Sequence, residues 1–351
     1  MNDKLFKLSE DGTVLIEFIG GDDVTEVKAP ASVTEIGEGA FAGRESLIFI
    51  YFYNVTKIGK RAFAGCKSLE SITIYMGDFG NTVIGEEAFA DCESLSSIKL
   101  IRRVTKVGKY AFRGCHSLKS FIIFDWDDYN ILEHVEEIGE GAFAGCDSLK
   151  SIRIPSVEEI GEHTFEGCTS LTSIDIPSVK EIGEHTFEGL SSLTSINIKS
   201  VEEIGEHTFE GLSSLTSINI NSVKEIGACA FKGCTSLTSI DIPKSVTVGE
   251  CAFEGCTSLS EVEINYNGLY ELGKDAFKGC PCEQSVMQEV AKERSRIRAK
   301  EVVSDTGSLH NEINLFTKYH NVEIVDIKYS TYFNTKSARS SALILYKKHG
   351  L

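Results

Sequence analysis

A short pattern of apolar and polar positions recurs along most of the chain. Each copy approximates V-x-x-I-G-x-x-A-F-x-G-C-x-S-L-x-x-I-x-I-P, and residues 157–177 form a complete example. The spacings between successive pattern phenylalanines are 22, 26, 23 and 31 residues, then five of 22 and one of 24. A fixed period of about 20 to 50 residues is typical of stacked repeats. The phenylalanines are Phe41, Phe63, Phe89, Phe112, Phe143, Phe165, Phe187, Phe209, Phe231, Phe253 and Phe277.

The last part of each copy predicts a strand. Ile174 and Ile176 alternate with polar residues, so both side chains should point inward. Gly161 and Gly167 should allow tight corners where a side chain would clash. One copy cannot bury its own apolar residues, whereas copies stacked about 4.8 Å apart can. We therefore predict an α/β repeat solenoid: a right-handed coil with a parallel sheet on one face and short helical or turn segments on the other.

The motif I-G-x-x-A-F-x-x-C-x-x-L-x-x-I-x-I-P resembles the BspA-like leucine-rich repeats. The match covers roughly residues 30–282 as eleven units. The resemblance implies a leucine-rich-repeat coil, and members of that family are mostly surface and adhesion proteins. Residues 1–29 are predicted to form an N-terminal cap, in which Asp11-Gly12-Thr13 makes a turn.

The composition changes after Cys282. Apolar residues at helical spacing predict a helical linker over 283–305, in which the helix ends near Lys300. A second helix is predicted near 309–316. Two β-rich runs, 322–329 and 341–346, complete a small C-terminal α/β domain over 306–351. Residues 310–348 resemble a small bacterial sporulation-associated domain, which implies a bacterial source.

Charge and hydropathy narrow the classes of partner and compartment. The formal charge is −17, and residues 283–351 hold 11 Lys and Arg against 8 Asp and Glu, so residues 1–282 carry −20. An acidic array repels phosphate backbones, so we expect no nucleic-acid partner. The longest apolar run, residues 47–53, is far too short to span a bilayer. The first residues lack the apolar core of a secretory signal, so we expect a cytoplasmic protein with reduced thiols.

Catalytic motifs are missing from the sequence. There is no G-x-x-x-x-G-K-[ST], G-x-S-x-G or H-E-x-x-H, and no G-x-G-x-x-G after a predicted strand. Residues 156–176, 178–198 and 200–220 are nearly identical, and duplicated units supply one group repeatedly instead of several groups in one place. Glutamate pairs such as Glu158-Glu159 and Glu202-Glu203 are predicted to lie in solvated loops. We therefore expect a chain without enzymatic activity or cofactor.

Two columns contain cysteine or histidine. Leu190 and Leu212 replace the cysteine that follows the phenylalanine by three residues, so this position should be a small apolar pocket. The second column, two residues before the phenylalanine, includes His163, His185, His207, Cys229 and Cys251, which could bind zinc or nickel if stacked. Other copies place Gly, Arg, Glu, Tyr or Asp there, which favours a solvent-facing position. The pocket cysteines are Cys66, Cys92, Cys115, Cys146, Cys168, Cys234, Cys256 and Cys280.

Outward aromatic residues gather in the first four copies. Exposed aromatic side chains are favoured at protein interfaces. Two longer spacings insert loops in the same region, and one of them contains the single tryptophan, which could instead fold back over the repeat edge. The predicted partner-binding residues are Phe49, Tyr51, Tyr53, Tyr75, Lys99, Ile122, Phe124, Trp126, Tyr129 and Arg153.

These features predict a non-enzymatic scaffold that binds a protein through the concave sheet and the loops of the N-terminal half. Two alternatives stay open: a metal-binding array along the histidine and cysteine column, and a targeting arm for an activity of the C-terminal domain. Self-association through that domain is also left open, and no membrane partner is expected.

Overall fold

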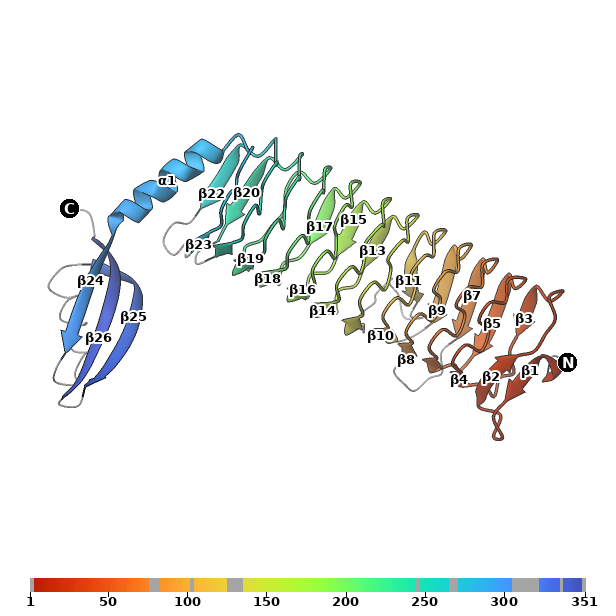
Figure 1. Cartoon of the computed structure of the whole chain (residues 1–351). Helices are drawn as coiled ribbons and strands as arrows, with labels where there is room; N and C mark the ends of the chain where they lie inside the picture. Colours follow the sequence, from red (N-terminus) through yellow and green to blue (C-terminus); the bar gives the residue numbers. More distant parts are fainter. Residues whose placement is uncertain are drawn as a thin grey trace. The chain divides into compact units, whose positions relative to one another are not determined.

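A computed structural model describes residues 3–75, 82–101, 104–124, 135–243, 246–264, 271–304, 322–334 and 337–348. Two compact units are present, Met1–Asn265 with Leu269–Cys282, and Tyr266–Gly268 with Glu283–Leu351. The first unit is a solenoid of stacked turns (Figure 1). The predicted repeat-solenoid fold is thereby confirmed.

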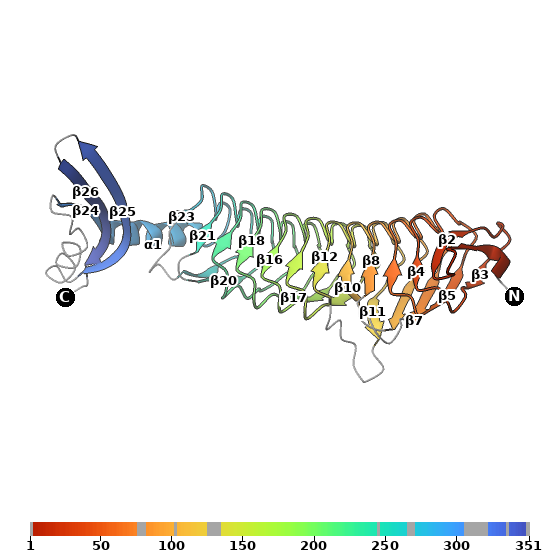
Figure 2. The ribbon, with the colours of Figure 1, turned by 90° about the horizontal axis from the view of Figure 1, so that it is seen from below.

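A ladder of parallel strands runs along the solenoid, at the V-x-x-I segment where no strand was predicted (Figure 2). Within the described residues it has 13 strands, all parallel except the first pair. Nine of them are only two residues long, and six of these nine consist of a glutamate and a buried isoleucine, as in Glu159 and Ile160. The strands are β1 (Phe6–Leu8), β2 (Val14–Phe18), β4 (Glu35–Ile36), β6 (Lys57–Ile58), β8 (Thr82–Ile84), β10 (Val104–Val107), β12 (Glu137–Ile138), β14 (Glu159–Ile160), β16 (Glu181–Ile182), β18 (Glu203–Ile204), β19 (Glu225–Ile226), β21 (Thr247–Val248) and β23 (Glu271–Leu272).

The predicted L-x-x-I-x-I sheet is present, but the described part of it is divided into sheets of five, three and two strands. One interruption has a local cause: the Asn219 side chain accepts a hydrogen bond from the Asn221 backbone N–H at 3.0 Å, and residues 217–220 form no strand. Such side-chain bonds compete with sheet hydrogen bonds. The strands are β3 (Glu26–Lys28), β5 (Phe49–Tyr53), β7 (Ser71–Tyr75), β9 (Ser97–Ile101) and β11 (Phe121–Phe124), then β13 (Ser151–Arg153), β15 (Ser173–Asp175) and β17 (Ser195–Asn197), then β20 (Ser239–Ile242) and β22 (Glu261–Ile264).

The pattern phenylalanines form one continuous stack through the core. Neighbouring ring centroids lie between 4.9 Å (Phe63 and Phe89) and 5.6 Å (Phe165 and Phe187) apart, and the rings are nearly parallel. Phe18, ahead of the first repeat, joins the stack 5.3 Å from Phe41. The segments that bear these rings are turns and not helices.

Two glycine positions meet different physical demands. A Cβ on Gly183 would lie 2.6 Å from the backbone nitrogen of Glu162 in the preceding turn, so this position needs glycine for close stacking. Gly189 has φ +71° and open space around it, so it needs glycine for its left-handed backbone.

The described part of the second unit contains a helix followed by an antiparallel sheet in the order β24-β26-β25. The helix α1 (Glu283–Arg296) ends earlier than predicted, because β24 (Ile297–Ser304) begins where the helix was expected to continue. β25 (Val322–Asn334) and β26 (Ser337–Lys348) extend the two predicted strands. The helix predicted near 309–316 lies outside the described residues.

In the first unit, a 3-10 turn, η1 (Asp3–Leu5), precedes β1.

Candidate interaction surfaces

The outward side of β5 forms an aromatic strip made of Phe49, Tyr51 and Tyr53. Phe49 is 37% exposed and the two tyrosines are half-buried, whereas the residues between them are buried. In the neighbouring strand, Lys28 pairs in register with Tyr51, and its Nζ lies 5.2 Å from the centroid of the Tyr53 ring. An ammonium over an aromatic face is a favourable contact. These three predicted residues therefore lie together on one accessible face.

The other predicted partner-binding residues fall into two groups. Arg153 lies in a different sheet, where its Nε is 2.9 Å from the Asp175 carboxylate, and that carboxylate also accepts a hydrogen bond from Asn197 at 2.7 Å. Arg153 is therefore engaged in a polar ladder along the central turns. For four of the remaining residues the structure gives only a backbone position in β7, β9 or β11; these are Tyr75, Lys99, Ile122 and Phe124. Trp126 and Tyr129 lie outside the described residues.

A groove of about 770 Å³ lies on the 13-stranded sheet, a face that the sequence analysis did not single out. Two columns of glutamates line it, and Lys109 is the single cation among its lining residues. Glu159 lies in β14 and Glu203 lies in β18, so the prediction that these two residues lie in loops was wrong. The repeated E-I-G-E sequence could have predicted an acidic face here, because it places two glutamates at the same positions of successive turns. The glutamates are Glu137, Glu140, Glu159, Glu162, Glu181, Glu184, Glu203, Glu206 and Glu225.

Cations from adjacent turns neutralise one end of this acidic groove. Lys106 lies 2.7 Å from the Glu137 carboxylate, and Lys109 lies 3.0 Å from that of Glu140. Hydrogen bonds from Tyr110 and then Lys109 lower the pKa of Glu140. Among the described residues, Glu159, Glu181 and Glu203 pair with no cation. Among the described lining glutamates, the ion pairs are therefore those of Glu137 and Glu140, at one end of the groove.

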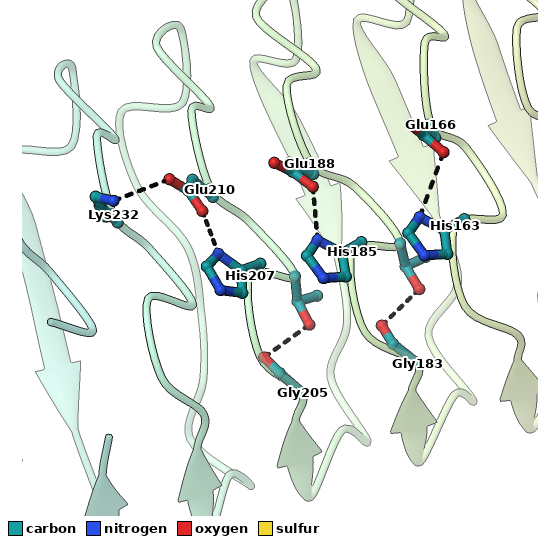
Figure 3. Close-up of polar contacts among 11 residues, drawn as sticks. His163, Glu166, Gly183, His185, Glu188, Gly205, His207, Glu210 and Lys232 are labelled. Atoms are coloured by element: carbon teal, nitrogen blue, oxygen red, sulfur yellow. Dashed lines mark hydrogen bonds and ion pairs between the residues drawn. The ribbon is translucent and has the colours of Figure 1, made fainter. Parts of the chain in front are cut away.

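The column that contains the histidines has an unusual backbone. All eleven of its residues have positive φ, including His163 (53°), His185 (55°) and His207 (55°). Non-glycine residues seldom adopt this left-handed conformation. It turns the three imidazoles outward into a parallel stack with centroids 4.9 Å apart (Figure 3).

Each imidazole in this stack contacts a glutamate three residues later. Glu166 Oε2 lies 3.3 Å from His163 Nδ1, at ion-pair distance but without hydrogen-bond geometry. His185 Nδ1 lies 2.6 Å from Glu188, and His207 contacts Glu210 in the same way. Parallel rings aim their lone pairs alongside one another, whereas a shared zinc ion needs nitrogens that converge at about 2.0–2.1 Å. The described residues contain no group of three His, Cys, Asp or Glu side chains suited to a metal ion. The geometry of the described histidines therefore does not support the metal-binding array.

The pocket cysteines are buried as predicted, and their thiols also make hydrogen bonds. Each thiol donates a hydrogen bond to the carbonyl of the phenylalanine in the preceding turn, for example from Cys168 to Phe143 at 3.2 Å. Burial raises the pKa of Cys168 to about 12. Such thiols are inert toward alkylation and metals at neutral pH.

The sequence profile of the BspA type leucine rich repeat region matches residues 17–129, 125–238 and 180–293. The chain belongs to this family. A leucine-rich repeat protein from Bacteroides ovatus is 33% identical to this BspA-type protein, with 79% of this chain and 83% of the other covered and a TM-score of 0.49. The leucine-rich repeat protein of T. pallidum is 26% identical over 61% of this chain and 90% of its own, with a TM-score of 0.41. The pneumococcal vaccine antigen PcpA is 23% identical over 76% and 79%, with a TM-score of 0.47.

No curated protein matches this BspA-type chain. None of the helices in the described part of the chain is both long and apolar enough to cross a membrane.

Proposed function

We propose that this BspA-type repeat protein is a non-enzymatic scaffold that binds a protein partner through the aromatic strip of β5. The observation that supports this proposal is the exposure of Phe49, with half-buried Tyr51 and Tyr53 beside it, on a regular sheet. Tyrosine and phenylalanine in such positions offer a large contact area at a low cost in side-chain entropy. Lys28 adds a positive charge to the same face, which favours a partner with an acidic rim.

The arrangement of the repeats supports a binding role over catalysis. Three successive turns repeat the same polar group in register: Thr164, Thr186 and Thr208 are buried and donate to glycine carbonyls of their own turns. These hydroxyls are used to close turns. A catalytic site needs several different groups that converge on one point.

The test is affinity capture from lysate of the source cells with four full-length baits: the wild type and three variants. Replacement of Phe49, Tyr51 and Tyr53 by Ala should reduce retention of the partner at least about tenfold, because truncated aromatic anchors dominate interface energies. The matched control, Asp175→Ala with Asn197→Ala, alters the same outward face in the central turns and should retain the partner.

The fourth bait replaces Glu159, Glu181 and Glu203 by Gln in the acidic groove. A partner lost from this bait, and retained by the aromatic variant, would overturn the proposal in favour of the groove. Equal capture by all four baits would also overturn it. Quantitative mass spectrometry of the eluted proteins measures each outcome.

A further inference from the structure

Two of the eleven cysteines differ from the rest in their surroundings. Cys229 and Cys251 are partly accessible, whereas the other nine are buried. They occupy consecutive turns of the left-handed column, with φ values of 55° and 56°. Their backbones are stacked in register, because the Cys229 N–H donates to Glu250 O and the Cys251 N–H donates to Lys274 O, both at 2.9 Å. The column therefore places the two thiols side by side on the surface.

The separation of the two turns suits a covalent link. The ring centroids of Phe231 and Phe253, two residues further along the same turns, lie 5.0 Å apart. Disulfide-linked residues have Cα atoms roughly 4.4 to 6.8 Å apart and Cβ atoms roughly 3.5 to 4.5 Å apart. The turn spacing that these rings show lies within the Cα range. A small shift of the backbone would bring the Cβ atoms within their range, and rotation about the Cα–Cβ bonds would then align the two sulfurs.

We propose that Cys229 and Cys251 form an oxidisable dithiol, which a small-molecule disulfide such as oxidised glutathione converts into a disulfide between adjacent turns. The Cys229 thiolate attacks a sulfur of the reagent, forms a mixed disulfide and releases one glutathione thiolate. The Cys251 thiolate then attacks the Cys229 sulfur and releases the second. Two protein thiols are oxidised, one glutathione disulfide is reduced to two glutathione molecules, and the two protein protons end on those molecules.

The neighbouring charges indicate which thiol attacks first. Burial raises the pKa of Cys229, and Glu210 and Glu254 add to the rise, whereas Lys232 acts to lower it. Burial raises the pKa of Cys251 as well, and there the hydrogen bond to Glu254 adds to the rise. A cation, Lys232, thus favours the thiolate of Cys229, so we assign the first attack to Cys229. Because both pKa values are raised, oxidation should accelerate as the pH rises above neutral.

A disulfide here would join two successive turns near the end of the repeat array. In a reducing compartment the pair stays a dithiol, and in an oxidising one it becomes a cross-link that holds the turns together. The oxidation state of this pair thus reports the compartment in which the protein resides.

Native oxidation of the full chain tests the proposal. The reduced protein is incubated with oxidised glutathione, quenched with acid, alkylated with N-ethylmaleimide in denaturant, and analysed by intact mass and tryptic mapping. We expect two thiols to escape alkylation and a cross-link between peptides 225–232 and 245–274. The oxidised form should have a higher thermal midpoint, and dithiothreitol should abolish the increase.

Two variants distinguish this pair from its buried neighbours. Cys229→Ser should abolish the cross-link. Cys234→Leu should preserve it, since Leu190 and Leu212 show that leucine fits this buried position. Alkylation of all eleven cysteines, persistent glutathione adducts without a cross-link, or a cross-link that uses Cys234 or Cys256 would overturn the proposal.

Discussion

The N-terminal turns with β3, β5 and β7 and the central turns with β13, β15 and β17 have the same core but different outward faces. Both stack a phenylalanine in every turn and pair their strands in parallel. Outside, β5 presents Phe49, Tyr51 and Tyr53, whereas the central turns present Arg153 bridged to Asp175. The core columns thus determine the solenoid and leave the outward columns free to specify a partner.

Removal of a core ring should cause the largest effect in both regions. Phe63→Ala and Phe187→Ala should each lower the free energy of unfolding by about 3–5 kcal/mol, since both rings are fully buried. Phe63 also contacts the edge of Phe52, with centroids 6.0 Å apart, so its loss should cost about 1 kcal/mol more. Denaturant unfolding measures the difference, and equal costs would show that the extra aromatic contact contributes nothing.

The two glycine positions should respond differently to one added methyl group. Gly183→Ala should cost at least about 2–3 kcal/mol, because its Cβ would meet the backbone of the preceding turn at 2.6 Å. Gly189→Ala should cost only about 1–2 kcal/mol, from its left-handed backbone alone. A larger loss at Gly189 than at Gly183 in thermal unfolding would contradict this account of the stacking.

Turns that contain a buried cysteine should lose stability at high pH. Burial raises the pKa of Cys168 from 9.0 to about 12, so the neutral thiol of the folded state contributes stability fully below pH 9. This contribution is lost as the pH rises from 9 toward 12, by at most about 1.4 kcal/mol per pH unit. Cys168→Leu should therefore have a shallower decline between pH 9 and 10.5 in urea unfolding. Parallel declines would show that this thiol does not titrate differently on folding.

The left-handed column should favour glycine at every turn, whatever the outward face. His185 has φ +55° and Arg61 has φ +53°. At either position the Gly variant should be about 1 kcal/mol more stable than the Ala variant, because alanine keeps the backbone strain. Urea unfolding of the four variants measures this difference. A more stable Ala variant would mean that the strain is relieved elsewhere.

Much of the solenoid follows from the repeat itself. The 22-residue period, the buried Phe, Leu and Cys columns and the corner glycines could all be predicted, because the same residue types recur at the same positions of successive copies. The 13-stranded sheet was missed because its strands are as short as Glu159 and Ile160, too short for a period of two to be seen. The positive φ of Arg61, Glu87 and His163 has no signature in these residue types.

The candidate surfaces were only partly predictable. Alternation in β5 correctly placed Phe49, Tyr51 and Tyr53 on the outer face. The acidic groove depends on a sheet that was not predicted, so its glutamates were assigned to loops. The pairing of Arg153 with Asp175 depends on strand register across turns, which the composition of one turn does not reveal.

Site-specific photocrosslinking in the source cells tests the central claim most directly. A photoreactive p-benzoylphenylalanine replaces Tyr51 in one full-length protein and Asn197, an outward position in the central turns, in another. The account predicts a discrete crosslinked protein from position 51 and none from position 197. Crosslinking of the same protein from both positions, or only from position 197, would contradict a partner-binding surface on the aromatic strip.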